Sequence, residues 1–356
     1  GAGGTVTSPA GLDCTLANGE ATGACSVQVA GGSTIGLHAV PAVGHEFAIW
    51  TEGGARLSGS SDHSIHVATD RSLAAAFHAS GDRPDEIVGP QVHVIYVVPV
   101  DGADRAMDVD GTLHGSVGSF RNWFRGGTAG YSLRFDLFDG ALDITFARLS
   151  RTDAQIQSYG AFVVSQIELE LANAGRLAPD KVYLVYYDGT STYSCGGAAW
   201  PPAVPGRVAA MYLRGMPQGV QCASQGFVGS AAAFPRYWEF AALHDLVHTM
   251  GIVDMEAPNH ASAYPAHVPE ANDLMYSGPG AWSIGPALQV DIGGDDYFGS
   301  NVPTGVTLLT SSPYVVAPLF PTGGRVSDPP GDAVSSLIVG LPPHPPFDWK
   351  GREAPR

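Results

Sequence analysis

Two histidines spaced four residues apart are the strongest candidates for chemistry in this chain. His244 and His248 lie in the run WEFAALHDLVHTMG, whose composition predicts a helix from about 235 to 250. Side chains four residues apart project from the same face of a helix, which is how a helix holds a zinc ion. Gly251 follows and allows the helix to stop and the chain to turn back. The spacing therefore predicts a Zn²⁺ site with a third ligand downstream of Gly251.

Three side chains beyond Gly251 are candidates for the third ligand. Asp254, His260 and His267 all qualify by type, because zinc accepts imidazole and carboxylate alike. Asp245 stands where zinc peptidases keep the carboxylate that takes a proton from the attacking water. An aspartate is one methylene shorter than the usual glutamate, and a general base must come within about 2.6–3.2 Å of the group it deprotonates. The pattern predicts a metal site, and it predicts hydrolysis only if this shorter side chain reaches the water.

The complete pattern is rarer than its parts. With 12 histidines among 356 residues, chance supplies about 0.4 pairs of the form His-x-x-x-His. Requiring an acidic residue after the first histidine and a glycine three after the second lowers this expectation to about 0.005. An ordinary solvated pair of histidines is therefore the weaker interpretation.

The residues before the site predict the sheet that carries it. The run 92–100, VHVIYVVPV, is apolar throughout, which is typical of a strand covered on both faces. A long helix is expected to begin after Thr152 or Asp153 and to end near Gly175, because its apolar residues keep a helical period. Further elements are expected at 117–125 (a short helix) and at 131–138, 141–149, 181–187 and 208–213 (strands). This order predicts a mixed α/β layer, completed before the site helix.

The first 80 residues predict a small all-β module. Short alternating runs bounded by turn residues occur at 26–29, 34–40, 47–50, 64–68 and 73–77. A linker rich in proline, glycine and charge follows at 81–91 and leads into a domain at 92–318. The module is interpreted as a spacer, and contact with a carbohydrate or a cell surface is the alternative. Its histidines have no ligand spacing and are interpreted as structural: His38, His45, His63, His66 and His78.

Composition argues against several classes of partner. The net charge is −16, and the 18 basic residues are nowhere clustered, which disfavours nucleic acids and anionic membrane surfaces. No window reaches the 18 apolar residues of a membrane span. Four cysteines form two sequence-local pairs, Cys14 with Cys25 and Cys195 with Cys222, which predicts disulfides and an oxidising compartment. The chain is therefore expected to act outside the cell.

Two further segments carry expectations. The loop 101–111, DGADRAMDVDG, contains four aspartates, but it lacks the distal glutamate of a calcium loop and is interpreted as solvated. The tail 319–356 is rich in proline and glycine. Its segment PTGGRVSDPPGD echoes the opening GAGGTVTSPAGLD and is interpreted as a degenerate second β module.

The motifs taken together resemble a known family. HDLVHTMG, APNH, AHVPEANDLMY and DIGGDDYFG, preceded by QVHVIYVVPVDGADR and CGGAAWPP, look like secreted bacterial zinc-metalloprotease-like proteins with a metzincin-type site, across roughly 91–318. The sequence NDLMYSG, 27 residues after His248, resembles the methionine turn that underlies the metal in metzincins, with Met275 as its methionine. The opening GGTVTSPAGLDC with LHAVPAVGHEFAIW resembles divergent repeat modules of bacterial secreted and cell-wall proteins.

This resemblance implies a fold and an activity. It implies a metzincin-like α+β or α/β domain that binds Zn²⁺ and cleaves a peptide or protein substrate, with Asp245 as base and Tyr276 steadying the oxyanion. It favours His267 as third ligand, because the similar sequences carry a histidine just before an acidic residue and the Asp-x-Met-Tyr turn. Asp254 and His260 remain alternatives. The rival interpretation is a catalytically inactive, metal-stabilised binding or adhesive protein.

Overall fold

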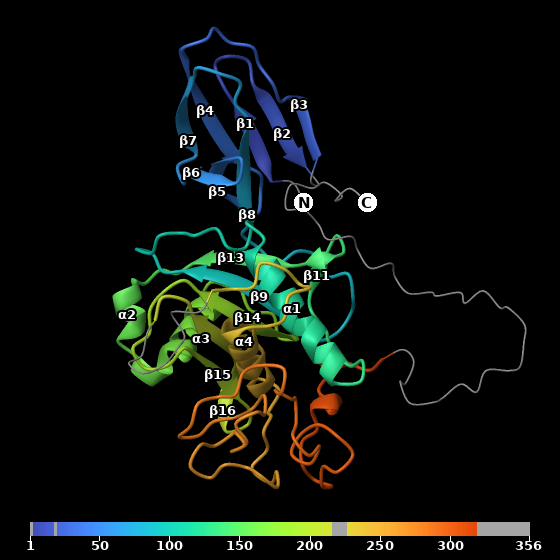
Figure 1. The fold of residues 1–356 in the computed structure, drawn as a ribbon. Helices are drawn as coiled ribbons and strands as arrows, with labels where there is room; N and C mark the ends of the chain where they lie inside the picture. The colour runs from blue at the N-terminus through green and yellow to red at the C-terminus, as the bar shows by residue number, and fades with distance from the viewer. Residues whose placement is uncertain (1–2, 18–19, 216–225, 319–356) are drawn as a thin grey trace, which may run out of the picture.

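The computed structural model describes residues 3–17, 20–215 and 226–318 and has a mixed α+β architecture with an all-β N-terminal part (Figure 1). The tail 319–356, expected to contain a degenerate β module, lies outside the described residues. Among the residues that are described, no helix is long and apolar enough to cross a membrane.

The N-terminal part consists of two antiparallel sheets. The first has the strand order β3-β2-β1-β4-β7, and the second has the order β6-β5-β8. Their strands are β1 (Gly4–Thr7), β2 (Asp13–Ala17), β3 (Glu20–Ala24), β4 (Ser33–Pro41), β5 (His45–Glu52), β6 (Ala55–Ser58), β7 (Asp62–Val67) and β8 (Leu73–Ala79). In β4, the alternate residues Ile35, Leu37 and Ala39 are buried, which is the pattern of a strand with one face on a core.

Most of the expected strands in this part are present, and one is not. The expected runs at 34–40, 47–50, 64–68 and 73–77 correspond to β4, β5, β7 and β8. The strand expected at 26–29 was wrong, because residues 26–29 are irregular and the partner of β2 is β3, just before them. Cys14 and Cys25 form the expected disulfide beside this β2–β3 hairpin. Cys195 is also disulfide-bonded, and its expected partner Cys222 lies outside the described residues.

The second part is built on a five-stranded sheet with the order β13-β9-β14-β16-β15. Its strands are β9 (Gln91–Val98), β13 (Ile144–Arg148), β14 (Lys181–Tyr187), β15 (Gly196–Trp200) and β16 (Val204–Tyr212). Strands β13, β9, β14 and β16 are parallel, and β15 runs antiparallel at one edge. Every residue of β9 and β14 is buried, as their continuous apolar sequences predict.

Helices cover both faces of this sheet (Figure 1). The helices α1 (Thr112–Gly127) and α4 (Tyr237–His248) pack on one face, and α3 (Val163–Asn173) packs on the other. The expected long helix after Thr152 is broken into α2 (Asp153–Gln157), a 3₁₀ turn and α3. Gly160 in that turn has a φ of 56°, which a continuous α-helix does not allow. Thr152 is the expected N-cap, and it forms a capping box with Gln155.

Other expected boundaries changed because two of the expected regions supply several short strands with different partners. The regions 131–138 and 141–149 divide into β10 (Ser132–Leu133), β11 (Leu137–Phe138), β12 (Ala141–Leu142) and β13. Strand β11 pairs with β12, whereas β10 pairs with the distant β17 (Val315–Val316). Beyond α4, regular structure is limited to η3 (Leu309–Ser311) and β17, in the described residues. The apolar run GVTLLT, residues 305–310, therefore forms no strand, and the chain from 251 to 308 is a long loop that is held by specific hydrogen bonds.

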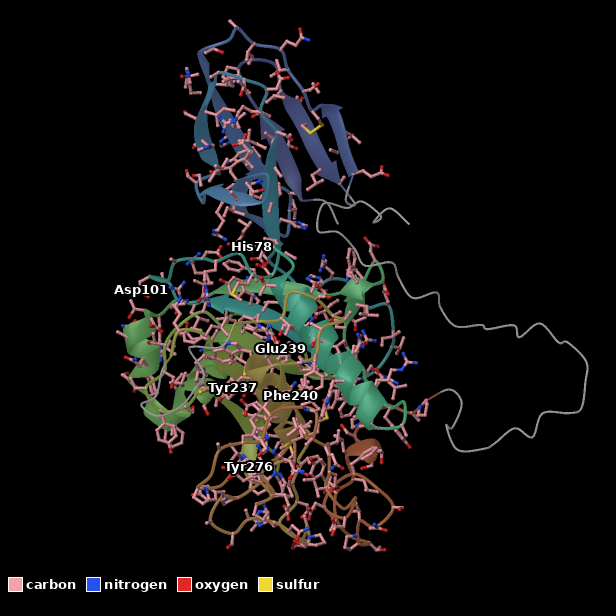
Figure 2. All side chains as sticks on the ribbon, in the orientation of Figure 1. His78, Asp101, Tyr237, Glu239, Phe240 and Tyr276 are labelled. Carbon is pink, nitrogen blue, oxygen red and sulfur yellow. A yellow bond between two sulfur atoms is a disulfide. The ribbon has the colours of Figure 1, made fainter. Side chains whose placement is uncertain are left out.

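The aspartate-rich loop 101–111 is solvated only in part. Asp101 and Asp110 are exposed, as expected. However, His78 of β8 donates one ring N–H to Asp108 (2.7 Å) and the other to Asp104 (2.7 Å), and Asp108 is 5% exposed. Figure 2 shows His78 between the N-terminal sheets and the α/β layer. Two of the four aspartates therefore join the two parts of the molecule.

Candidate metal centre

Helix α4 carries two of the histidines of interest, and a buried carboxylate fixes its start. Glu239 is fully buried and accepts hydrogen bonds from the Arg236 backbone N–H (3.0 Å) and the Ser116 hydroxyl of α1 (2.7 Å). It caps the first turn of α4 and ties α4 to α1 in the centre of the domain (Figure 2). His244 and His248 follow on this anchored helix, one turn apart.

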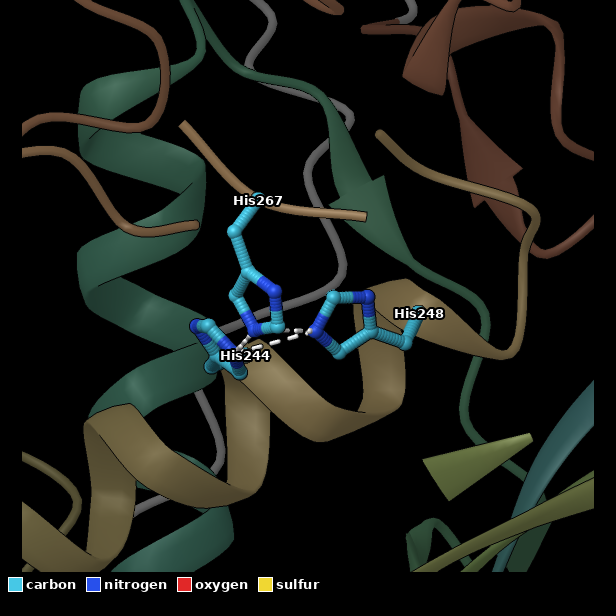
Figure 3. Close-up of side chains that lie close together, drawn as sticks. All are labelled: His244, His248 and His267. Carbon is cyan, nitrogen blue, oxygen red and sulfur yellow. Dashed lines mark hydrogen bonds between the residues drawn. The ribbon is translucent and has the colours of Figure 1, made fainter. Parts of the chain in front are cut away.

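Three imidazoles converge beside α4, and we call His244, His248 and His267 the histidine cluster. The His244 Nε2 atom lies 3.0 Å from the His248 Nε2 atom and 3.1 Å from the His267 Nε2 atom. The His248 and His267 Nε2 atoms lie 3.2 Å apart (Figure 3). Tetrahedral ligands at the zinc–nitrogen distance of about 2.0–2.1 Å stand about 3.3–3.4 Å apart. The cluster therefore has a spacing close to that of a three-histidine zinc site.

The second nitrogen of each imidazole fixes its orientation. In every case the Nδ1–H group donates to a backbone carbonyl oxygen: His244 to Leu274 (2.7 Å), His248 to Ile252 (2.9 Å) and His267 to Pro265 (2.8 Å). An imidazole with its proton on Nδ1 presents an unprotonated Nε2 lone pair. Three lone pairs thus face one point. With no proton among these three atoms, they cannot form hydrogen bonds to one another, but they can bind one cation together.

Burial keeps the histidine cluster neutral. Burial, reinforced by the neighbouring His267, lowers the pKa of His244 to about 3. Burial also lowers the pKa of His248 far below its usual value and lowers the pKa of His267. At neutral pH these nitrogens therefore remain unprotonated, and their lone pairs are available to bind a metal ion.

The loop after α4 brings one of the three candidate third ligands to the cluster. His267 lies in the histidine cluster, whereas Asp254 and His260 form hydrogen bonds to residues outside the cluster. The Asp254 carboxylate accepts the Thr307 hydroxyl (2.8 Å), and His260 Nε2 accepts the Ala266 backbone N–H (3.1 Å). Gly251, at the end of α4, has a φ of 82°, the left-handed conformation expected where the helix stops.

Asp245 lies between α4 and strand β15. A Cβ atom built on Gly196 would overlap the Asp245 Oδ2 atom and the end of Met211, so the missing side chain at Gly196 makes room for the carboxylate. Burial raises the pKa of Asp245 to about 8. A divalent cation at the neighbouring cluster would lower this pKa and favour the charged form that a general base needs.

The turn 272–278 is anchored by a buried aspartate. Asp273 accepts the Met275 backbone N–H (2.7 Å) and the Tyr297 hydroxyl (2.7 Å), and Met275 is fully buried. The Leu274 carbonyl in this turn is the one that orients His244. The Tyr276 hydroxyl bonds to the backbone N–H and carbonyl of Gly280 (both 3.1 Å), so it is held by its own turn here.

Strand β15 and Gly196 were missed by the sequence analysis. The segment GGAAW was not predicted to be a strand, because it is short and contains two glycines. The Pro–Pro turn between GGAAW and the apolar run VAAMY is the signal from which its hairpin with β16 could have been predicted.

Comparison with known families identifies one region. Residues 12–81 match the family model of the Divergent InlB B-repeat domain. The match agrees with the expected resemblance of the N-terminal module to divergent repeat modules. No curated protein matches the chain.

Comparison with solved structures finds weak similarities. The archaemetzincin from Methanopyrus kandleri is 14% identical, with a TM-score of 0.27, over 52% of this chain and 82% of its own. The wild-type OgpA from Akkermansia muciniphila is 14% identical, with a TM-score of 0.29, over 61% of this chain and 66% of its own. Similarities of this size do not establish a shared fold, so the function has to be inferred from the site itself.

Proposed function

We propose that this protein is a secreted zinc-dependent peptidase that holds its metal with the histidine cluster. One observation carries the proposal: three unprotonated Nε2 atoms lie within 3.2 Å of one another, each oriented by an Nδ1–H bond to a backbone carbonyl. Among the described residues, no fourth His, Cys, Asp or Glu ligand belongs to this group, and three imidazoles are the donor set of a catalytic rather than a purely structural zinc. His267 is the third ligand in this proposal.

The side chains around the cluster have distinct roles in hydrolysis. A bound Zn²⁺ supplies a Lewis acid that polarises the scissile carbonyl and lowers the pKa of a water molecule. Asp245 takes the proton from the attacking water and passes it to the leaving amine. Tyr276 donates a hydrogen bond to the developing oxyanion when its hydroxyl turns away from Gly280. Edge strand β15, beside Asp245, offers its backbone to an extended peptide.

The substrate class and the location follow from this proposal. An extended peptide or protein segment is the substrate that an edge strand can bind. The Cys14–Cys25 disulfide supports an extracellular location for a protein of bacterial type. We divide the chain into the N-terminal module 1–80, the linker 81–91 and the peptidase domain 92–318, with the module as a spacer or as a contact with a cell surface or polysaccharide.

The shortened base makes Asp245 the residue to test. Four proteins are compared: the native chain, Asp245→Ala, Asp245→Glu and the exposed control Asp70→Ala. Metal analysis gives the zinc content of each, and cleavage of casein or a peptide library gives its turnover. We expect one zinc per chain in all four. Turnover should fall by about 100-fold or more in Asp245→Ala and be unchanged in Asp70→Ala.

Two results would contradict the proposal. A native chain without zinc would remove the metal site. Zinc at full occupancy with no turnover in either the native chain or Asp245→Glu would instead support the rival function, a metal-stabilised binding protein in which the N-terminal module makes the biological contact.

A further inference from the structure

A second group of candidate ligands lies in the loop DIGGDDYFGSN, residues 291–301. One oxygen atom from each of Asp291, Asp295 and Asp296 lies within 4.8 Å of the others. No salt bridge to a lysine, arginine or histidine involves these three aspartates in the described ranges. The site Asp82–His93–Asp136–Asp143 is different, because Lys181 and Arg83 compensate its charge.

Asp291 has an oxygen atom that lacks a partner. The residue is 8% exposed. Its Oδ2 atom accepts three backbone N–H groups, from Asp296 (3.2 Å), Tyr297 (2.7 Å) and Phe298 (2.5 Å), but its buried Oδ1 atom has no hydrogen bond. Buried carboxylate oxygens are normally hydrogen-bonded or bound to a metal, because desolvation without a partner is costly.

The negative charge of this loop reaches a neighbouring carboxylate. Burial raises the pKa of Glu270, and the charges of Asp296 and Asp295 raise it further. Glu270 is not one of the residues whose oxygen atoms lie within 4.8 Å of one another. The three aspartates therefore form an acidic group whose charge is not compensated by a basic side chain in the described residues.

Two glycines give the loop its shape. Gly293 and Gly294 have φ values of 87° and 65°, a conformation that other residues rarely adopt. A Cβ atom on Gly293 would lie 2.6 Å from the Asp295 Oδ1 atom. The sequence Gly-Gly before Asp-Asp therefore lets the loop fold back and bring Asp295 and Asp296 to Asp291.

We propose that Asp291, Asp295 and Asp296 bind a structural calcium ion. The donors are all oxygens, which suit a hard cation such as calcium or magnesium. Zinc, in contrast, prefers thiolate and imidazole ligands. Calcium is favoured over magnesium because it accepts irregular carboxylate and carbonyl geometry, whereas magnesium requires a near-ideal octahedron and keeps its waters. The histidine cluster takes no part in this site.

The ion would cross-link segments that surround the metal centre. Asp296 accepts the Asn259 backbone N–H (2.7 Å), in the loop that leads to His267. Ile292, next to Asp291, donates its N–H to Asp273 (2.9 Å). Calcium would therefore fasten the loop that delivers His267 and the turn that holds Met275, where regular secondary structure is absent.

The test is a titration of the full-length chain, freed of metal and reloaded with zinc, with CaCl₂ and separately with MgCl₂. Binding is followed by calorimetry and by thermal unfolding. We expect one calcium per chain with a dissociation constant of about 10⁻⁵–10⁻³ M and a rise in Tm of several degrees at saturation, with a smaller effect of magnesium.

Variants identify the ligands. Asp295→Asn, whose side chain is half-buried, should weaken calcium binding by about tenfold or more, and the exposed control Asp70→Asn should leave it unchanged. Repeating the titration on His267→Ala separates this site from the histidine cluster, because calcium binding should persist there. No calcium binding up to about 10 mM, a concentration well above the weakest dissociation constant expected for such a site, would overturn the proposal. Equal affinity in Asp295→Asn and the native chain would also overturn it.

Discussion

At the scale of single residues, the position of one hydrogen atom on each imidazole decides what the histidine cluster can bind. Because His244, His248 and His267 each donate Nδ1–H to a backbone carbonyl, their Nε2 atoms have no protons to share. Their low pKa values keep them neutral. Backbone carbonyls from three separate segments thus fix the tautomer and orientation of the three imidazoles without a bound metal.

The third ligand can be tested directly. His267→Ala removes one of three imidazoles and should weaken zinc binding by about 100-fold or more. His260→Ala is the matched control, because it removes an acceptor for the Ala266 N–H and a ring that stacks on Trp200 but no member of the histidine cluster. It should cost about 1 kcal/mol of stability while zinc is retained. Competition with a chromophoric chelator measures both affinities. Equal zinc loss in the two variants, or greater loss in His260→Ala, would reject His267 as the ligand.

At the scale of elements, the contact between β15 and α4 positions Asp245, the proposed general base. Strand β15 is the antiparallel edge of an otherwise parallel sheet, and α4 lies against it. Gly196 in β15 leaves the space that the Asp245 carboxylate fills. The edge strand therefore has two roles in the proposed enzyme: it presents backbone to a peptide and it accommodates the base.

A methyl group at Gly196 tests this arrangement. Gly196→Ala should lower turnover by about tenfold or more at unchanged zinc content, because the new Cβ displaces Asp245 without touching the histidine cluster, and overpacking should cost about 1–3 kcal/mol of stability. The matched control is Gly36→Ala in β4, where a Cβ meets nothing within 4 Å. Turnover equal to that of the control would show that β15 does not position the base.

At the scale of the whole molecule, one buried histidine joins the N-terminal sheets to the α/β layer. His78 is 1% exposed, stacks on Phe146 of β13 at 4.0 Å between ring centroids, and donates to Asp104 and Asp108. Burial alone lowers the pKa of His78, but the hydrogen bonds to the two aspartates outweigh it and raise the pKa from 6.5 to about 9.

This raised pKa predicts how stability depends on pH. Because the folded state binds the proton more tightly than the unfolded chain, the contribution of His78 is fully present below pH 6.5 and is lost as pH rises through about 9. The loss is at most about 3 kcal/mol. Denaturant unfolding between pH 6 and 10 should show this decrease in the native chain and in the exposed control His66→Gln, but not in His78→Gln. A decrease of equal size in His78→Gln would assign the effect to another group.

The sequence by itself determined the features that depend on neighbouring residues. A helix places residues four apart on one face, so His244 and His248 were paired from their spacing, and Gly251 marked the end of α4. Continuous apolar runs predicted β9 and β14, which are buried throughout. The Cys14–Cys25 disulfide also joins residues that are close in sequence.

Only the tertiary structure decided which distant groups meet. Beyond Gly251 the chain has no period, so spacing could not choose among Asp254, His260 and His267, and the choice depends on the hydrogen bonds that hold each loop segment. The same holds for Asp296, whose carboxylate accepts the backbone N–H of Asn259 in a separate segment. Loops are positioned by packing and by long-range hydrogen bonds, and these contacts exist only once the core has formed.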